Sequence, residues 1–332
     1  MTLIVGLLIA AQFVELRKSD QEIAEAFRGE PVRPVVFRYQ QDGRTIRYIE
    51  SARPDSDSLP VIVFFHGAPS SLSFFEKFFK DPILLKHARL VAVDRPGYGF
   101  SDFGKIEPSI ARQAELLQPV INRYRDAPFL VLVGSSYGGP LAARLAMNNP
   151  GVVDHVVFVS SALGPGLERV YDISYLVDKP LFRWMVPQIL LNANDEKLSH
   201  KKALEEIAPD WDRITAGVTF LHGQKDDLVY PSNVEFARKR LVNARVKEYL
   251  LPENRHDIVF NKREYMTKVI LDVLVSYASP IANSHKKAVR LSLLQEALSS
   301  AESRNLHSFG GLLHLLYHEP QQLLPHDLQP LF

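Results

Sequence analysis

Residues 129–140 read FLVLVGSSYGGP, and they contain the strongest local signal in the sequence. The apolar run at 129–133 has the length and continuous hydrophobicity of a strand buried on both faces of a parallel sheet. Pro140 fits the first turn of a helix, where its missing N–H removes no hydrogen bond. The stretch therefore predicts a buried strand, then a tight turn, then a helix.

Ser136 is the central residue of the predicted turn, in the pentapeptide Gly134-Ser135-Ser136-Tyr137-Gly138. A serine hydroxyl is a poor nucleophile unless a tight, strained strand-to-helix turn holds it outward among small neighbours. Gly134 and Gly138 provide that clearance. We therefore expect Ser136 to be a nucleophile and Ser135 to be a turn or pocket-lining residue.

Strand-length and helix-length patterns alternate on both sides of this stretch. Asp42-Gly43 separates two segments at 35–39 and 45–50, which predicts a β-hairpin. Helical periodicity covers 110–125 and 140–147. Apolar runs of strand length occur at 61–65, 90–93, 129–133, 155–159, 218–221 and 246–251. The pattern predicts an α/β fold with a doubly wound, mostly parallel sheet of about eight strands and helices on both faces.

The interval between Ser161 and Ala216 breaks this alternation, because it contains helical pieces and no strand-like run. A connection of this length without structure is unusual in a compact domain, so we expect a helical cap at residues 162–213. It leaves the carboxyl end of a strand, where open α/β sheets bind ligands, so it is either a lid or a packing decoration. Trp184 and Met185 are its candidate substrate-binding residues.

Ser136 needs a base that takes its proton and an acid that orients the base. Asp226 and His256 each follow a predicted strand, so all three residues would lie at the same edge of the sheet. The order serine, aspartate, histidine is the one expected for this chemistry on a doubly wound sheet. Asp227 is adjacent to Asp226 and is the alternative acid.

A developing oxyanion also needs backbone N–H donors. The tetrapeptide His66-Gly67-Ala68-Pro69 follows the predicted strand at 61–65, so its turn would face the same cleft. The N–H groups of Ala68 and Tyr137 are the candidate oxyanion hole. We expect His66 to be structural and to tie this turn to neighbouring backbone, not to act in catalysis.

Five motifs in one order resemble those of the α/β-hydrolase-fold serine hydrolases, in particular the cap-bearing, esterase-like members. They are 66–69 (HGAP), 94–101 (DRPGYGFS), 134–139 (GSSYGG), 223–226 (GQKD) and His256, and the resemblance covers about residues 34–277. It implies Ser136 as nucleophile, Asp226 as acid, His256 as base and the helical insertion as the cap domain. The chain departs from the pattern at Arg255, where many relatives have glycine. Asp94-Arg95, which begins the second motif, is expected to form a buried ion pair that shapes its loop.

The identity of the nucleophile limits the reaction. Serine in this fold implies an acyl-enzyme, whereas aspartate would suggest an alkyl-enzyme ester. We therefore predict a serine hydrolase that cleaves carboxylic esters with small to medium apolar groups and needs no metal or organic cofactor. The same residues could cleave an amide, a C–C bond or a peroxyacid, because a triad does not encode the leaving group. A non-catalytic ligand receptor that retains the fold is the alternative from another class.

The composition excludes several other classes of protein. The 332 residues carry 39 Lys and Arg against 38 Asp and Glu, a formal charge of +1, and 46% of them are hydrophobic. This near-neutral balance argues against a nucleic-acid-binding surface. The absence of cysteine excludes disulfides, thiolate nucleophiles, iron–sulfur clusters and cysteine zinc sites. The predicted partner is therefore a small-molecule ester, and the oligomeric state stays open.

The N-terminal segment is unusually apolar. Residues 3–14 form a run interrupted only by Gln12, which is shorter than the roughly 18 to 20 residues of a spanning helix. Arg17 and Lys18 follow the run, whereas a secretory signal has its basic residues in front. The run is therefore either a membrane anchor or a helix docked on apolar surface, and the chain is either membrane-associated or cytoplasmic.

The C-terminal segment is rich in leucine and histidine. His314 and His318 have the spacing of a shared metal site, but no third ligand has a helical spacing with them, so a peripheral tail is the preferred interpretation. The predicted organisation is an N-terminal segment at 1–30, a core at 31–161 and 214–278, a cap at 162–213 and a tail at 279–332.

Overall fold

The computed structural model describes residues 16–51 and 58–277. Three features predicted from the sequence lie outside these residues. They are the apolar run at 3–14, the tail at 279–332 and, within that tail, the pair His314 and His318.

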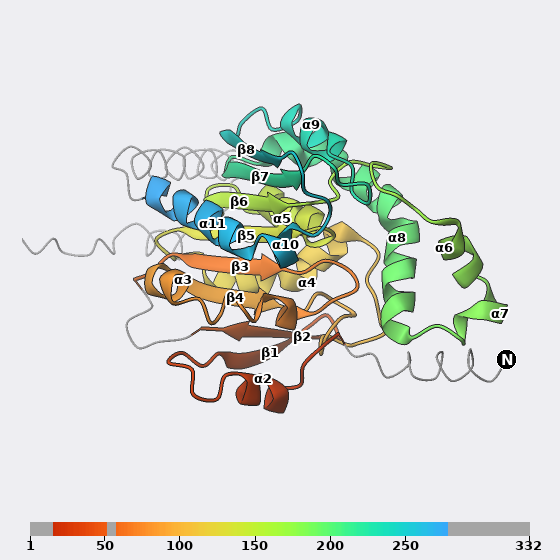
Figure 1. The fold of residues 1–332 in the computed structure, drawn as a ribbon, viewed down its shortest axis with the longest axis horizontal. Helices are drawn as coiled ribbons and strands as arrows, with labels where there is room; N and C mark the ends of the chain where they lie inside the picture. Colours follow the sequence, from red (N-terminus) through yellow and green to blue (C-terminus); the bar gives the residue numbers. More distant parts are fainter. Residues whose placement is uncertain (1–15, 52–57, 278–332) are drawn as a thin grey trace, which may run out of the picture. The chain divides into compact units, whose positions relative to one another are not determined.

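An eight-stranded sheet forms the centre of the described fold (Figure 1). Its strands are β1 (Val35–Gln41), β2 (Arg44–Glu50), β3 (Val61–Phe65), β4 (Arg89–Val93), β5 (Leu130–Ser135), β6 (His155–Val159), β7 (Gly217–Gly223) and β8 (Val246–Leu251). Their order in space is β1-β2-β4-β3-β5-β6-β7-β8. The β1–β2 hairpin is antiparallel, β2 pairs antiparallel with β4, and all pairs from β4 to β8 are parallel. The predicted doubly wound, mostly parallel sheet is thus confirmed.

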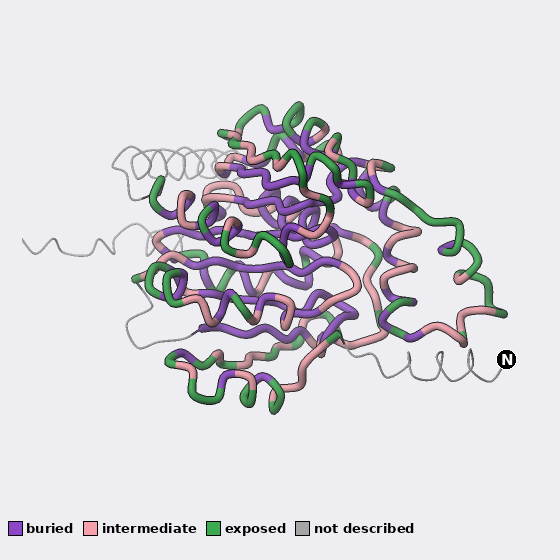
Figure 2. Tube along the Cα trace, viewed as in Figure 1, coloured by how far each residue is buried: buried purple, intermediate pink, exposed green. Residues whose placement is uncertain are grey.

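Helices cover both faces of the sheet. One face packs against α4 (Ile110–Arg123), α5 (Gly138–Asn148) and α9 (Ser232–Arg238), and the other against α2 (Asp20–Ala26), α3 (Pro82–His87) and α11 (Arg263–Tyr277). Successive residues of one strand alternate between the two cores, because side chains of a strand point to opposite faces. In β3, Val63 belongs to the first core and Ile62 and Phe64 to the second. The central strands are accordingly buried along their length (Figure 2).

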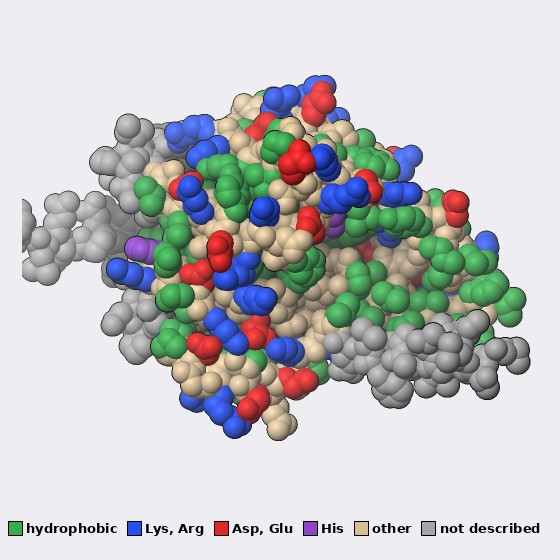
Figure 3. Space-filling view, in the orientation of Figure 1, with side chains coloured by type: hydrophobic (Ala, Val, Ile, Leu, Met, Phe, Trp, Pro, Cys, Tyr) green, Lys and Arg blue, Asp and Glu red, His purple; other side chains and the backbone are tan. Residues whose placement is uncertain are grey.

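The connection from β6 to β7 is helical. It contains α6 (Asp172–Val177), α7 (Pro180–Arg183), α8 (Gln188–Ile207) and a 3-10 helix (Ala208–Arg213). The 3-10 helix belongs to the core, because its Trp211 is buried against Phe158 and Phe236. The remaining three helices lie within the predicted cap, whose range at 162–213 also includes the 3-10 helix, and we call these three helices the cap. Hydrophobic side chains gather on the face of the cap that Figure 3 shows.

In the described ranges, each helix is too short or too polar to cross a bilayer.

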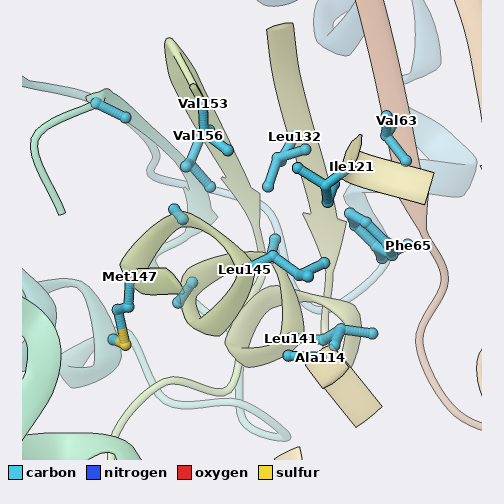
Figure 4. Close-up of a cluster of buried hydrophobic side chains, with 14 of the residues drawn as sticks. Val63, Phe65, Ala114, Ile121, Leu132, Leu141, Leu145, Met147, Val153 and Val156 are labelled. Carbon is cyan, nitrogen blue, oxygen red and sulfur yellow. The ribbon is translucent and has the colours of Figure 1, made fainter. Parts of the chain in front are cut away.

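The α5 helix fixes the end of β5, where the predicted nucleophile lies. Leu145 of α5 lies on the side of the strand residue Leu132, Leu141 lies beside Ala114 of α4, and all four side chains are fully or almost fully buried (Figure 4). Each buried leucine contributes about 1.5–3 kcal/mol to folding. The turn between β5 and α5 is therefore held between two well-packed elements.

Candidate active site

Ser136 lies in a strained turn between β5 and α5. Its φ angle is +50°, in the left-handed region that residues with a side chain rarely adopt. The neighbouring glycines are required, because a Cβ at Gly138 would lie 2.1 Å from the Phe65 carbonyl oxygen and one at Gly134 would lie 2.5 Å from the Gly138 oxygen. The predicted strand–turn–helix is therefore present, with Ser136 at its apex.

The structure brings Ser136, Asp226 and His256 together from three different strand ends. His256 Nε2 is 3.1 Å from Ser136 Oγ, and His256 Nδ1 is 2.8 Å from Asp226 Oδ2. The carboxylate accepts a hydrogen bond from the Nδ1–H group, which leaves Nε2 without a proton and able to accept the hydrogen bond of the serine hydroxyl. This is the hydrogen-bond sequence expected of an acid, a base and a nucleophile, and the catalytic roles of the three residues stay a prediction.

The two adjacent aspartates have different environments. Asp226 is buried, and its Oδ1 accepts hydrogen bonds from the backbone N–H groups of Leu228 (3.0 Å) and Val229 (2.8 Å). Asp227 is exposed and pairs with Arg255, whose Nη1 lies 3.1 Å from Asp227 Oδ2. The arginine that replaces a glycine before the histidine thus points to the exposed carboxylate. The geometry favours Asp226 over Asp227 as the acid.

The turn that carries Ala68 lies against the nucleophile. A Cβ added to Gly67 would be 3.0 Å from Ser136 Cβ and 3.6 Å from its Oγ, so a side chain at this position would be in tight contact with Ser136. Ala68 is the next residue, and Tyr137 directly follows the nucleophile at the start of α5. Their role as oxyanion donors stays a prediction.

His66 and Arg95 hold this turn by its backbone. His66 Nδ1 donates to the Gly67 oxygen (2.7 Å), and His66 Nε2 accepts from the Arg95 N–H (3.0 Å). Arg95 Nε in turn donates to the His66 carbonyl (2.8 Å). Burial, together with the nearby Arg95 charge, lowers the pKa of His66 well below its usual value. His66 is therefore neutral and makes the backbone contacts expected of a structural histidine.

Arg95 is paired with the cap and not with its neighbour in the sequence. Glu196 of α8 accepts from Arg95 Nη2 (2.9 Å) and from the Tyr98 hydroxyl (2.7 Å), and all three side chains are buried. Asp94 pairs instead with Arg47, at 2.7 Å. Burial acts to raise the pKa of Glu196, but the charge and hydrogen bonds of Arg95 outweigh it and lower the pKa. The expectation that Asp94 pairs with Arg95 is therefore wrong. Asp94 pairs with Arg47 and Arg95 pairs with Glu196, and the second of these buried pairs links α8 to the turn beside Ser136.

A second buried group links the cap to Tyr137. Glu168 accepts from the Tyr137 hydroxyl (2.7 Å), and His200 Nδ1 of α8 lies 2.6 Å from the other oxygen of Glu168. Burial acts to raise the pKa of Glu168, yet the hydrogen bond and charge of His200, with the charge of Lys197, lower it. Sequence reasoning missed Glu168, Glu196 and His200, because nothing distinguishes them from the other charged residues of the insertion.

The two predicted substrate-binding residues have different positions. Trp184 follows α7 and is 75% exposed, so it does not line an enclosed pocket in this conformation. Met185 is half-buried. Their role in substrate binding stays a prediction.

Within the described residues, no three His, Asp or Glu side chains are grouped as metal ligands.

Removing Glu196 should destabilise the protein strongly. Glu196→Ala leaves the buried guanidinium of Arg95 without its carboxylate, which costs about 3–5 kcal/mol. Urea denaturation at pH 7, analysed with one m-value for all variants, measures the loss of unfolding free energy. Glu205→Ala is the matched control, because Glu205 is on the same helix but exposed, and we expect it to stay within about 0.5 kcal/mol of wild type. A loss for Glu196→Ala no larger than that of the control contradicts the prediction.

Parts of the chain are similar to known proteins. A family model described as alpha/beta hydrolase fold matches residues 60–184. A stretch of 121 residues is 31% identical to a 1-acylglycerol-3-phosphate O-acyltransferase of Arabidopsis thaliana and covers 35% of this chain and 28% of that protein. A stretch of 106 residues is 34% identical to an sn-1-specific diacylglycerol lipase of Mus musculus and covers 32% of this chain and 34% of that protein.

Solved structures agree with the family match at the level of the fold. An esterase from Exiguobacterium antarcticum has a TM-score of 0.54 and 20% sequence identity, over 70% of this chain and 96% of that chain. The chain therefore has the alpha/beta hydrolase fold, and the predicted resemblance is confirmed at the level of the fold. The family match contains the motifs at 66–69, 94–101 and 134–139, whereas 223–226 and His256 lie outside it. The sequence matches span only 28% and 34% of the length of the two curated relatives, so they identify a shared segment.

Proposed function

We propose that this protein is a serine hydrolase that cleaves carboxylic esters through an acyl-enzyme on Ser136. The observation that carries the proposal is the unbroken hydrogen-bond sequence from Asp226 through His256 to Ser136, with the serine on a strained turn. Side chains that serve only to pack the core do not require a serine at positive φ, as Ser136 is. Strain of this kind persists where the surrounding structure enforces it, most often at functional sites.

The reaction proceeds in two halves. Ser136 Oγ attacks the ester carbonyl while its proton passes to His256 Nε2, and the N–H groups of Ala68 and Tyr137 stabilise the oxyanion. The intermediate collapses, the alcohol leaves with the proton from His256, and the acyl group remains on Ser136. Water then attacks the acyl-enzyme with His256 again as base, which releases the acid and restores the serine.

The substrate class follows from less direct support. Relatives and neighbours carry the names diacylglycerol lipase and esterase, which supports esters with apolar acyl groups. We propose groups of small to medium size, with the acyl chain lying between the triad and the cap. Trp184 and Met185 would contact it when the cap closes.

Acyl transfer is the second candidate, because two relatives are named 1-acylglycerol-3-phosphate O-acyltransferases. The acyl-enzyme is common to both reactions, and a hydroxyl of the acceptor takes the place of water in the second half. The two functions therefore differ only in what deacylates Ser136.

Matched substrates distinguish these functions. A phenyl ester and the anilide of the same acyl group, in a series of chain lengths, should show turnover of the ester at least 100-fold faster than that of the anilide. Comparable turnover of the anilide contradicts the esterase proposal. Adding 1-acylglycerol 3-phosphate tests the second candidate, since a transferase forms diacylglycerol 3-phosphate faster than it releases free acid. Absence of turnover on all these substrates, in folded protein, favours the receptor alternative.

A further inference from the structure

The cap has an exposed apolar surface that its own packing does not use. Of the sixteen large hydrophobic side chains exposed in the described residues, half lie within residues 170–190. They are Val170, Tyr171, Ile173, Tyr175, Leu176, Leu181, Trp184 and Leu190, and we call them the cap patch. Contiguous exposed apolar side chains of this kind mark interaction sites in soluble proteins.

The two short helices of the cap have their polar and apolar sides reversed. In α6 the only buried side chain is Ser174, whereas Ile173 (59%), Tyr175 (57%) and Leu176 (44%) are exposed. None of the side chains of α7 is buried, and Leu181 is 71% exposed. Figures 2 and 3 show both helices as exposed and largely hydrophobic on the visible face. A helix that faces water has the opposite arrangement.

Polar contacts attach α6 and α7 to α8. Arg183 forms two hydrogen bonds with the carboxylate of Asp195, at 2.6 and 2.7 Å, and Asn194 Nδ2 donates to the Ser174 carbonyl at 3.1 Å. The α8 helix is itself fastened to the core through Glu196. The polar contacts of α6 and α7 therefore face α8, and the apolar side chains of the cap patch are exposed on the outer side.

The described chain begins beside the base of the cap. The guanidinium of Arg17 lies 4.1 Å from the ring centre of Phe103 and donates to the Gly99 oxygen at 3.2 Å. The same loop contacts α8, because Asn192 Nδ2 donates to the Gly97 oxygen at 2.8 Å. The described chain therefore begins near the first turns of α8, which carry Leu190 of the cap patch, and the apolar run at 3–14 precedes this point in the sequence.

We propose that the cap patch docks on the surface of a phospholipid bilayer, on the side of the molecule where the described chain begins. Tryptophan and tyrosine with aliphatic neighbours are the residues that favour the interface between water and lipid. Residues 169–184 carry three basic and two acidic side chains, so their net charge is only +1. Apolar burial, and not attraction to anionic lipid, therefore drives the docking.

Trp184 reports on this docking directly. The chain has two tryptophans, and Trp211 is 1% exposed, so a change of emission on adding lipid arises at Trp184. With the full chain and phosphatidylcholine vesicles, we expect a blue shift of the emission and quenching by lipids brominated on the acyl chains. Raising the salt from 0.05 to 0.5 M should change the affinity less than about threefold, since the net charge is small.

Paired variants test the surface. Ile173→Ser with Leu181→Ser should weaken vesicle binding about 100-fold, roughly tenfold for each side chain withdrawn from lipid. Ile83→Ser with Val242→Ser is the matched control, because these residues are similarly exposed on α3 and after α9, outside the cap. The control should bind like wild type. Equal unfolding midpoints show that both variants are folded.

Other occupants of the cap patch predict different results. A chain that starts at Arg17 should keep the Trp184 shift with weaker binding, which supports the proposal. Tighter binding by this shortened chain would mean that residues 1–16 cover the patch. Self-association that shields Trp184 without lipid would assign the patch to a second copy of the chain. Either result, or unchanged binding by Ile173→Ser with Leu181→Ser, overturns the proposal. The Ser136→Ala chain should bind vesicles like wild type, so the outcome is independent of ester hydrolysis.

Discussion

Replacing Ser136 with alanine is expected to lower kcat for ester hydrolysis by about 10⁶-fold, because no other group at the site takes over the attack. His256 Nε2 would lose its hydrogen bond with the serine hydroxyl, and Asp226 would still orient the ring. The fold should be unchanged, since alanine accepts the same turn with a smaller side chain. The residual rate would reflect binding and the oxyanion donors alone.

Covalent labelling gives the clearest measurement of this effect. A fluorophosphonate should add once to the wild-type chain and not to Ser136→Ala, as read by intact mass. Ser135→Ala is the control, because Ser135 is also buried and is adjacent, but it is the last residue of β5. Labelling that disappears with Ser135→Ala, or persists with Ser136→Ala, contradicts the assignment. No labelling of folded wild type would mean that Ser136 is not activated.

Much of the fold could be predicted because its signals are local. The runs at 61–65 and 155–159 coincide with β3 and β6, since a strand buried on both faces must be continuously apolar. The segment at 246–251 coincides with β8, an edge strand that is only partly buried. The turn at Ser136 could also be predicted from its local sequence. A strained strand-to-helix junction tolerates only glycine at positions where a Cβ would overlap backbone. Gly134 and Gly138 occupy two such positions, so they can be recognised in the sequence.

The contacts between cap and core could not be predicted in the same way. Arg95 and Glu196 are 101 residues apart, and nothing in either local sequence names the partner. Glu196 belongs to a helix with many charged residues, and only tertiary packing decides which of them is buried. Trp184 and Trp211 illustrate the same limit, because both belong to the predicted insertion, yet one is exposed on the cap and the other is buried in the core.

Replacing Asp226 with asparagine is expected to lower kcat by about 10⁴-fold, whereas Asp227→Asn should change it less than about threefold. Asp226 Oδ1 accepts two backbone N–H groups, and the asparagine oxygen can keep both, so the amide nitrogen would face His256 Nδ1. That nitrogen donates a proton, and His256 must then accept at Nδ1 and carry its proton on Nε2. In this tautomer the histidine can no longer take the proton of Ser136.

The two substitutions together separate the acid from its neighbour. Each removes one negative charge from adjacent positions, so a general electrostatic effect would appear in both variants. Asp227 forms exposed pairs with Arg255 and, more distantly, with Arg169, and such pairs contribute at most about 1 kcal/mol each. We therefore compare kcat for one phenyl ester in both variants at the same pH. A difference between them reports the position of the carboxylate, because the change in charge is the same. A large loss with Asp227→Asn alone would mean that the loop rearranges to bring Asp227 onto His256. Equal losses in both variants would mean that the histidine needs negative charge nearby more than it needs a fixed tautomer.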